Sequence, residues 1–259
     1  MMHMEITLRS TALDMDTKVT VLFPEDRHHT ADTRGKTYPV LYILNGGKED
    51  CSSWVNLSTL FLMCRDLDLV VVLPSGNNSS YCDAVYGQNY FTWISEELPI
   101  KMKNLFPITD DPEQTFIMGE SMGGYGTARI ALACPEKFGK AVILSGGNFH
   151  PFQFGATPHR IGIFGSEEEW KTSDNNLYNL VDRLSAYEGR KPEYIFYCGT
   201  EDRAYTACKE LEDRLRSTCP DVQVKSEYWH GQHNFFFWNQ AIPKALKEFG
   251  FDIVENSVV

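Results

Sequence analysis

The feature of the sequence that most constrains its fold is the segment 115–126, which reads TFIMGESMGGYG. Strand-forming residues lead into Gly119-Glu120-Ser121-Met122-Gly123, and small residues that suit the start of a helix follow. Where a chain turns sharply from strand to helix, side chains beside the turn collide with neighbouring backbone, so glycine is needed there. The two glycines therefore indicate a strained turn that exposes the hydroxyl of Ser121, an arrangement called a nucleophile elbow.

Apolar runs of strand length alternate with longer amphipathic stretches along the chain, which is typical of an α/β sheet. Strands are expected at 4–9, 18–23, 40–44, 69–73, 115–118, 141–145, 193–197 and 222–229. Helices are expected at 54–65, 90–104, 125–133, 204–217 and 235–249, and Pro99 should kink or interrupt the second of them. The sequence predicts an α/β-hydrolase fold, with a mostly parallel central sheet and helices on both faces.

The composition limits what this chain can be. Its 259 residues, 42% hydrophobic and 23% charged, predict one globular domain spanning 1–259. No apolar stretch approaches the roughly 20 residues that span a bilayer, and the start of the chain lacks the cationic and apolar segments of a signal peptide. The net charge of -11 disfavours nucleic acids and anionic membranes as partners. Seven scattered cysteines favour reduced thiols and a cytoplasmic location. Association into a homo-oligomer is left open.

The longest insertion, at about 147–190, lies between two predicted core strands. In this fold it would sit above the strand ends, near Ser121. It is rich in aromatic residues, namely Phe149, Phe152, Phe154, Phe164 and Trp170. These residues either pack the insertion internally, as apolar residues usually do, or form a lid or acyl pocket. Phe149, Phe152 and Trp170 are the candidates for the pocket.

A serine hydroxyl needs a histidine to accept its proton and a carboxylate to orient that histidine. His233 is the preferred base, because it lies in a short loop between the last strand and the last helix, from which it can reach the elbow. His230, at the strand end itself, is the rival. The acid should follow the preceding strand, where Glu201 and Asp202 are adjacent. The shorter Asp202 is preferred, although a carboxylate pair at this place would also suit the start of a helix.

The negative charge that develops on an attacked carbonyl oxygen requires preplaced N–H donors. One donor is expected from the backbone of Met122, directly after the serine. The other is expected from the loop after the 40–44 strand, where Gly46 and Gly47 let the backbone approach a substrate closely. The sequence does not decide between these two glycines.

On these residues the chain resembles the esterase D and tributyrin-esterase group of α/β-hydrolases, which includes S-formylglutathione hydrolases and some feruloyl and acetyl esterases. The likeness covers nearly the whole chain, including 39–47, 74–81, 119–126, 198–202 and 231–238. It implies Ser121, Asp202 and His233 as the catalytic triad. Two departures from the group are Asn45, where many relatives have histidine, and Glu120, where His, Leu or Phe is more common. Glu120 would raise the pKa of the histidine, bind a polar group of the substrate in the pocket, or be a buried acid with its hydrogen bonds satisfied, and we favour the last of these.

Together these observations predict a serine esterase that cleaves small or short-chain acyl esters through an acyl-serine intermediate, without a cofactor. The alternatives are a thioesterase of the S-formylglutathione type, a feruloyl or acetylxylan esterase, an acyltransferase, and a noncatalytic protein that keeps the fold. No metal site is expected, because His28 and His29 form an adjacent pair for which the spacing suggests no third ligand.

Overall fold

In the computed structural model, which describes residues 1–25, 35–153 and 155–253, one eight-stranded sheet has the order β1-β2-β4-β3-β5-β6-β7-β8. Its strands are β1 (Met2–Ser10), β2 (Met15–Phe23), β3 (Val40–Leu44), β4 (Val70–Pro74), β5 (Thr115–Glu120), β6 (Lys140–Leu144), β7 (Glu193–Gly199) and β8 (Val224–Trp229). β1 and β2 pair antiparallel, β2 also runs antiparallel to β4, and all other neighbours are parallel. The predicted α/β-hydrolase fold and its antiparallel opening pair are confirmed.

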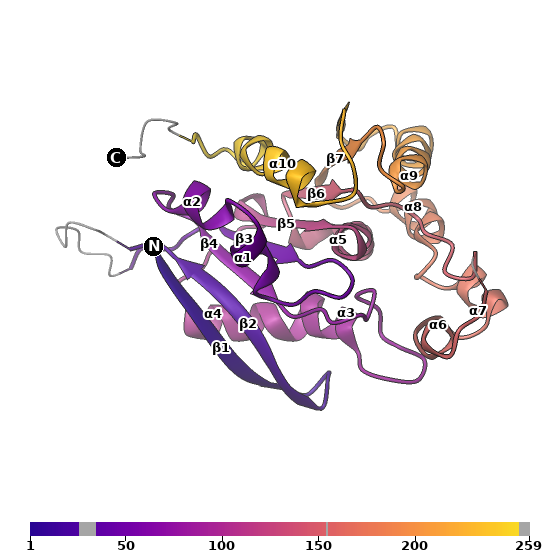
Figure 1. Ribbon diagram of the computed structural model, residues 1–259, viewed down its shortest axis with the longest axis horizontal. Coiled ribbons are helices and arrows are strands. Elements are labelled where there is room, and N and C mark those ends of the chain that lie inside the picture. The colour runs from indigo at the N-terminus through magenta and orange to yellow at the C-terminus, as the bar shows by residue number, and fades with distance from the viewer. Residues whose placement is uncertain (26–34, 154, 254–259) are drawn as a thin grey trace.

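Helices cover both faces of this sheet (Figure 1). On one face lie α1 (Ser53–Leu57), α2 (Leu60–Cys64) and α10 (Phe235–Glu248), whose apolar residues pack against strand residues such as Ile43 and Val71. On the other face lie α3 (Tyr90–Thr92), α4 (Leu98–Leu105), α5 (Met122–Ala133), α8 (Leu177–Ser185) and α9 (Tyr205–Thr218). Strands β3 and β4 are buried along their whole length, because helices cover their apolar side chains on both faces of the sheet.

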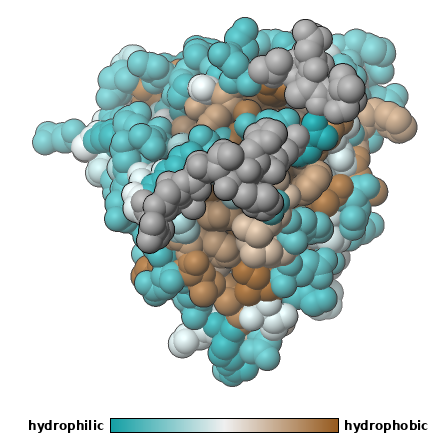
Figure 2. Space-filling view, turned by 90° about the vertical axis from the view of Figure 1, so that its left-hand side faces the viewer, coloured by the Kyte–Doolittle hydropathy of each residue, from teal (hydrophilic) through white to brown (hydrophobic). Residues whose placement is uncertain are grey.

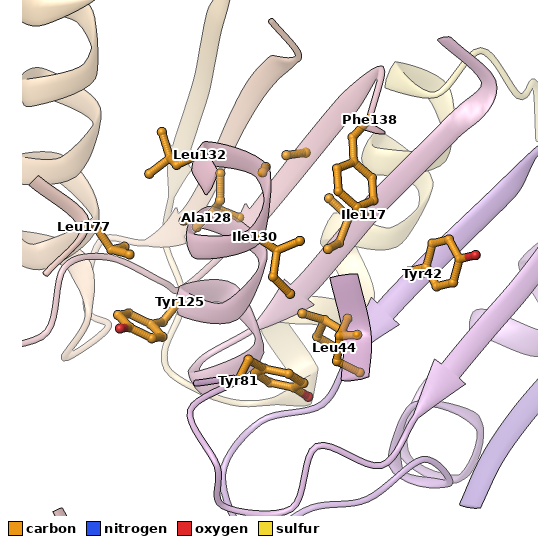
Figure 3. Close-up of a cluster of buried hydrophobic side chains, with 14 of the residues drawn as sticks. Tyr42, Leu44, Tyr81, Ile117, Tyr125, Ala128, Ile130, Leu132, Phe138 and Leu177 are labelled. Atoms are coloured by element: carbon orange, nitrogen blue, oxygen red, sulfur yellow. The ribbon is translucent and has the colours of Figure 1, made fainter. Parts of the chain in front are cut away.

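Helix α5, which follows the elbow, is the central helix of the second face. Figure 3 shows Ile130 of α5 directed towards Leu44 and Ile117 of the sheet, with Leu177 of α8 on the helix's other side. Ten of the twelve residues of α5 are buried. A helix buried on several sides fixes the position of its first turn, so the residues of the elbow are held rigidly.

Two predicted helices differ from their expected form. The helix expected at 54–65 is divided into α1 and α2, because Ser58 bonds through its hydroxyl to the backbone of Trp54 and Leu60, and Asn239 of α10 accepts the amide of Thr59. In the helix expected at 90–104, the π-helical segment Trp93–Glu97 precedes Pro99. Pro99 has no N–H to donate to the Ser95 carbonyl, which accepts from Lys137 Nζ at 2.9 Å instead. The helix therefore continues through Pro99 to Leu105, with a π-helical segment before the proline in place of a break.

The segment between β6 and β7 contains α6 (Pro158–Phe164), α7 (Glu167–Thr172) and α8. In Figure 1, α6 and α7 lie at the right-hand end of the molecule, beyond the start of α5. Figure 2 looks onto the opposite, left-hand end, where apolar residues at the centre of the face are surrounded by hydrophilic ones.

Candidate active site

The elbow at the end of β5 has the strained geometry that its glycines predict. Ser121 has φ 56° and ψ -115°, a combination that side chains rarely adopt. A Cβ on Gly119 would lie 2.5 Å from the Gly123 carbonyl oxygen, and one on Gly123 would lie 2.2 Å from that of Leu44. The close approach of β3, β5 and α5 therefore requires both glycines, and it leaves the Ser121 side chain half-buried at the start of the helix.

The structure brings Ser121, His233 and Asp202 into one hydrogen-bonded chain. His233 Nε2 lies 2.7 Å from Ser121 Oγ, and His233 Nδ1 lies 2.8 Å from Asp202 Oδ1. An ionised carboxylate only accepts hydrogen bonds, so Nδ1 carries the imidazole proton and Nε2 is free to accept from the serine hydroxyl. The three residues come from the ends of β5, β7 and β8, which meet at one edge of the sheet.

Asp202 is buried, and its surroundings favour the ionised form. Burial alone would raise the pKa of this carboxyl, but hydrogen bonds from His233, the Ala204 amide and Ser145 lower the pKa below its ordinary value. The Ala204 amide donates to Oδ1 at 2.7 Å. Ser145 is held in turn by Trp238, whose indole N–H donates to Ser145 Oγ at 2.9 Å. The carboxylate is thus fixed in place and charged, as an orienting acid must be.

The rival residues lie apart from this chain of hydrogen bonds. His230 is 83% exposed in its side chain and pairs with Glu201, whose Oε1 lies 3.1 Å from His230 Nδ1. The structure therefore places the two rejected alternatives together on the surface, next to the buried pair of Asp202 and His233. Because neighbouring residues of a turn point in different directions, Glu201 is separated from Asp202, and His230 from His233.

Of the three residues expected to donate to the oxyanion, Met122 lines the cleft in front of Ser121, and Gly46 and Gly47 lie in the loop after β3, which packs against the elbow at Glu120. Met122 is the first residue of α5, where backbone N–H groups have no acceptor within the helix. Gly46 is buried, and its backbone lies against the carboxyl of Glu120. Gly47 is exposed, and within the described parts of the chain its amide has no backbone acceptor. Of the two glycines, Gly47 is thus the one that lies at the surface.

Asn45, which replaces the histidine of many relatives, organises this loop. Its side-chain amide donates to the carbonyls of Gly46, at 2.8 Å, and Glu49, at 3.0 Å. Its Oδ1 accepts from the Gly76 amide at 2.8 Å and from the Tyr81 hydroxyl at 3.1 Å. The side chain of Asn45 therefore holds the backbone of its own loop and joins it to the loop after β4.

Glu120 is fully buried beneath the same loop. Its carboxyl hydrogen-bonds that of Glu49, and a side chain on Gly46 would come within 2.3 Å of Glu120 Oε2. Burial raises the pKa of Glu120 well above its ordinary value, and the charge of Glu49 raises it further. Glu120 therefore keeps its proton and donates to Glu49. The expectation that Glu120 belongs to the substrate pocket is wrong, because its side chain is fully buried and is not among the residues that line the cleft in front of Ser121.

Comparison with known proteins places this geometry in a family. The Esterase family matches residues 10–249, which include every residue of the site described above. The chain belongs to this family. An acetyl esterase of Caldicellulosiruptor saccharolyticus is 26% identical over 258 residues, which are 94% of this chain and 96% of the relative.

Solved structures agree with this assignment. The fluorophosphonate-binding serine hydrolase FphF of Staphylococcus aureus, with substrate bound, is 27% identical with a TM-score of 0.89, covering 97% of this chain and 99% of its own. An S-formylglutathione hydrolase, FrmB, of Staphylococcus aureus is also 27% identical, with a TM-score of 0.85 and coverage of 96% and 98%. The chain is a serine ester hydrolase, and its substrate is a small-molecule ester.

A cleft of about 470 Å³ opens in front of Ser121 of this esterase. Phe149 lines the cleft, as predicted for a pocket residue. Phe152 and Trp170 do not, because they are buried in the insertion, where both rings pack against His150. Their assignment to the pocket is corrected accordingly. Phe154 lies outside the described residues.

Several lining residues were missed by the sequence analysis. Besides Ser121, Met122, Phe149, His233 and Phe164, one of the aromatic residues noted in the insertion, the cleft is lined by Ser80, Tyr125, His150, Pro151, Gln153, His159, Arg160, Ile163 and Arg203. Arg203 directly follows Asp202, so its place beside the site could have been inferred from that neighbour. The residues of α6 carried no such signal, because the position of the insertion depends on tertiary packing.

Two further features concern the whole chain. All seven cysteines are buried and free of disulfide bonds. In residues 1–25, 35–153 and 155–253, no helix is long and apolar enough to cross a membrane, and no cluster of His, Cys, Asp and Glu side chains is suited to a metal ion. His28 and His29 lie outside those ranges.

Proposed function

We propose that the esterase cleaves small or short-chain acyl esters, with Ser121 as nucleophile, His233 as general base and acid, and Asp202 as the residue that orients His233. The observation that carries this proposal is the continuous hydrogen-bonded chain, with 2.7 Å from Ser121 Oγ to His233 Nε2 and 2.8 Å from His233 Nδ1 to Asp202 Oδ1. The acetyl esterase relative supports a small acyl group.

In the acylation step, Ser121 Oγ attacks the ester carbonyl while His233 Nε2 takes the hydroxyl proton. The carbonyl oxygen becomes an oxyanion, which the amides of Met122 and Gly47 stabilise by hydrogen bonding. When the tetrahedral intermediate collapses, the bond to the alcohol breaks and His233 returns the proton to the leaving alkoxide. The products of this step are the free alcohol and an acyl group bound to Ser121.

In the second step a water molecule attacks the acyl-serine, with His233 again accepting the proton. The acid is released and the Ser121 hydroxyl is restored, so one ester and one water give one acid and one alcohol. Asp202 remains ionised throughout and stabilises the transient imidazolium. The insertion at about 147–190, through Phe149 and the helix α6, supplies the wall of the acyl pocket, since Ile163 and Phe164 line the cleft.

Hydrolysis of 4-nitrophenyl acetate, butyrate and longer esters tests this proposal. The wild type should turn over the shorter esters, and Ser121→Ala should lower kcat by about 10⁵-fold or more. Glu201→Gln, which changes an exposed carboxylate beside Asp202, is the matched control and should remain active. Equal rates for the wild type, Ser121→Ala and the blank would refute the proposal.

A thioesterase activity is the second candidate, because the S-formylglutathione hydrolase structure covers this chain almost as fully as FphF does. The same residues would cleave a thioester by the same steps. Comparison of kcat/KM for S-formylglutathione with that for 4-nitrophenyl acetate decides between the two candidates.

A further inference from the structure

The cleft in front of Ser121 is basic, although the chain as a whole carries a net charge of -11. Its lining includes two arginines, Arg160 and Arg203, and, besides His233, the histidines His150 and His159. No aspartate or glutamate is among the described residues that line it. The cleft next to Ser121, where a substrate would bind, is therefore positively charged in an otherwise acidic protein.

The two arginines of the cleft form no ion pair with a carboxylate of the described residues. Among the described residues, neither Arg160 nor Arg203 has a carboxylate within ion-pair distance. Arg160, at the start of α6, gives one hydrogen bond from Nη1 to the Gly155 carbonyl at 2.9 Å. Arg203 is exposed, and the carboxylate next to it in the chain, Asp202, is buried against His233.

Arginines elsewhere on the surface are paired. Arg9, Arg183, Arg190, Arg214 and Arg216 each form an ion pair with an aspartate or glutamate. With many carboxylates available on an acidic surface, an arginine usually finds a partner in the protein. The absence of such partners around the cleft therefore distinguishes Arg160 and Arg203 from these surface arginines.

The two histidines add less positive charge than the arginines. His150 Nε2 lies 3.3 Å from Glu167 Oε1, which offsets any charge on its ring. His159 Nε2 lies 3.1 Å from the Asn78 carbonyl and donates to it, so this ring is held as a fixed wall of the cleft. The unpaired positive charge in the cleft thus comes from Arg160 and Arg203.

We propose that the natural ester of this site carries an anionic group, with a carboxylate as its simplest form, and that Arg160 and Arg203 bind this group while Ser121 reacts with the acyl carbon. The proposal rests on the proposed function and adds the substrate class. A guanidinium presents N–H donors in a planar fork that matches a carboxylate, and a partly enclosed cleft strengthens the attraction. An anionic group on either the acyl or the alcohol portion of the ester satisfies this chemistry.

Matched pairs of esters that differ only in charge test the proposal. On the acyl side, the mono-4-nitrophenyl ester of glutaric acid is compared with the corresponding ester in which the free carboxylate is a carboxamide. On the alcohol side, 4-carboxyphenyl butyrate is compared with 4-carbamoylphenyl butyrate. The pair that shows the preference identifies the portion of the substrate that the arginines hold.

For one of the pairs, kcat/KM of the carboxylate ester should exceed that of the carboxamide by about tenfold or more, as expected for charged hydrogen bonds. Arg160→Gln and Arg203→Gln should each remove most of this preference and leave the carboxamide rate within about twofold of the wild type. Arg9→Gln, which changes a paired arginine on β1, is the control and should keep the preference.

The proposal is overturned if both carboxamide esters react as well as their carboxylate partners, or if the arginine variants slow charged and neutral esters equally. These outcomes differ from failure of the proposed function. In that case no ester, charged or neutral, would be hydrolysed faster by the wild type than by Ser121→Ala.

Discussion

Replacement of Glu120 by glutamine should change how the stability of the protein depends on pH. In the folded protein, burial and the neighbouring Glu49 raise the pKa of Glu120 well above its ordinary value. In the unfolded chain this pKa returns to about 4.3. Between these two pKa values the folded state binds one proton more than the unfolded state, so the wild type loses stability as the pH rises.

The size of this effect follows from the proton count. One additional proton bound by the folded state lowers the free energy of unfolding by about 1.4 kcal/mol for each pH unit, up to the folded pKa. Glutamine has nearly the same shape, and its N–H can donate to Glu49 in place of the protonated carboxyl. Glu120→Gln should therefore be more stable than the wild type, by a margin that grows with pH.

Urea unfolding at pH of about 5, 6 and 7 measures this margin. Glu136→Gln, which alters an exposed carboxylate without an ion-pair partner among the described residues, is the control and should follow the wild type at every pH. Unfolding free energies of Glu120→Gln and wild type that stay parallel across this range would refute the reasoning. That result would mean that Glu120 is ionised in the folded protein.

Three further changes have defined outcomes. Gly123→Ala should lower the free energy of unfolding by about 1–3 kcal/mol, because its Cβ would meet the Leu44 carbonyl oxygen at 2.2 Å. At Gly47 a Cβ would make only an ordinary contact with Asn78 Oδ1 at 3.8 Å, so Gly47→Ala should unfold like the wild type, and equal losses in the two variants would contradict this. Asp202→Asn should lower kcat about 10⁴-fold, and a loss below about tenfold would argue against its role. Burial alone would raise the pKa of the Glu212 carboxyl, but hydrogen bonds from lysine, tyrosine, serine and arginine side chains lower the pKa to about 2. Glu212 should therefore contribute its full stabilisation of the fold only above its unfolded pKa. The stability gap between wild type and Glu212→Gln should thus close as the pH falls towards 2, and a gap independent of pH would refute this.

Features determined by local sequence were predictable. The elbow follows from its two glycines, because only a strand that turns directly into a helix requires them. The buried strands follow from apolar runs such as Val40–Leu44, and the positions of Asp202 and His233 follow from their loops after β7 and β8.

Features that depend on contacts between distant segments were not predictable. The break between α1 and α2 involves Asn239, which lies 180 residues from Thr59 in the chain. The pairing of Glu120 with Glu49 depends on how the loop after β3 crosses the end of β5, so the sequence showed the carboxylate without its partner. The basic lining of the cleft likewise depends on where the insertion places Arg160, and no local pattern indicates that position.

Covalent labelling of Ser121 tests the central claim most directly. A fluorophosphonate probe reacts with an activated serine, so intact-mass analysis of the labelled protein followed by peptide mapping reports which residue is the nucleophile. The account predicts one adduct per chain, located on Ser121 and absent from Ser121→Ala, with slower labelling of Asp202→Asn. An unlabelled wild type, or an adduct that persists in Ser121→Ala, would contradict it.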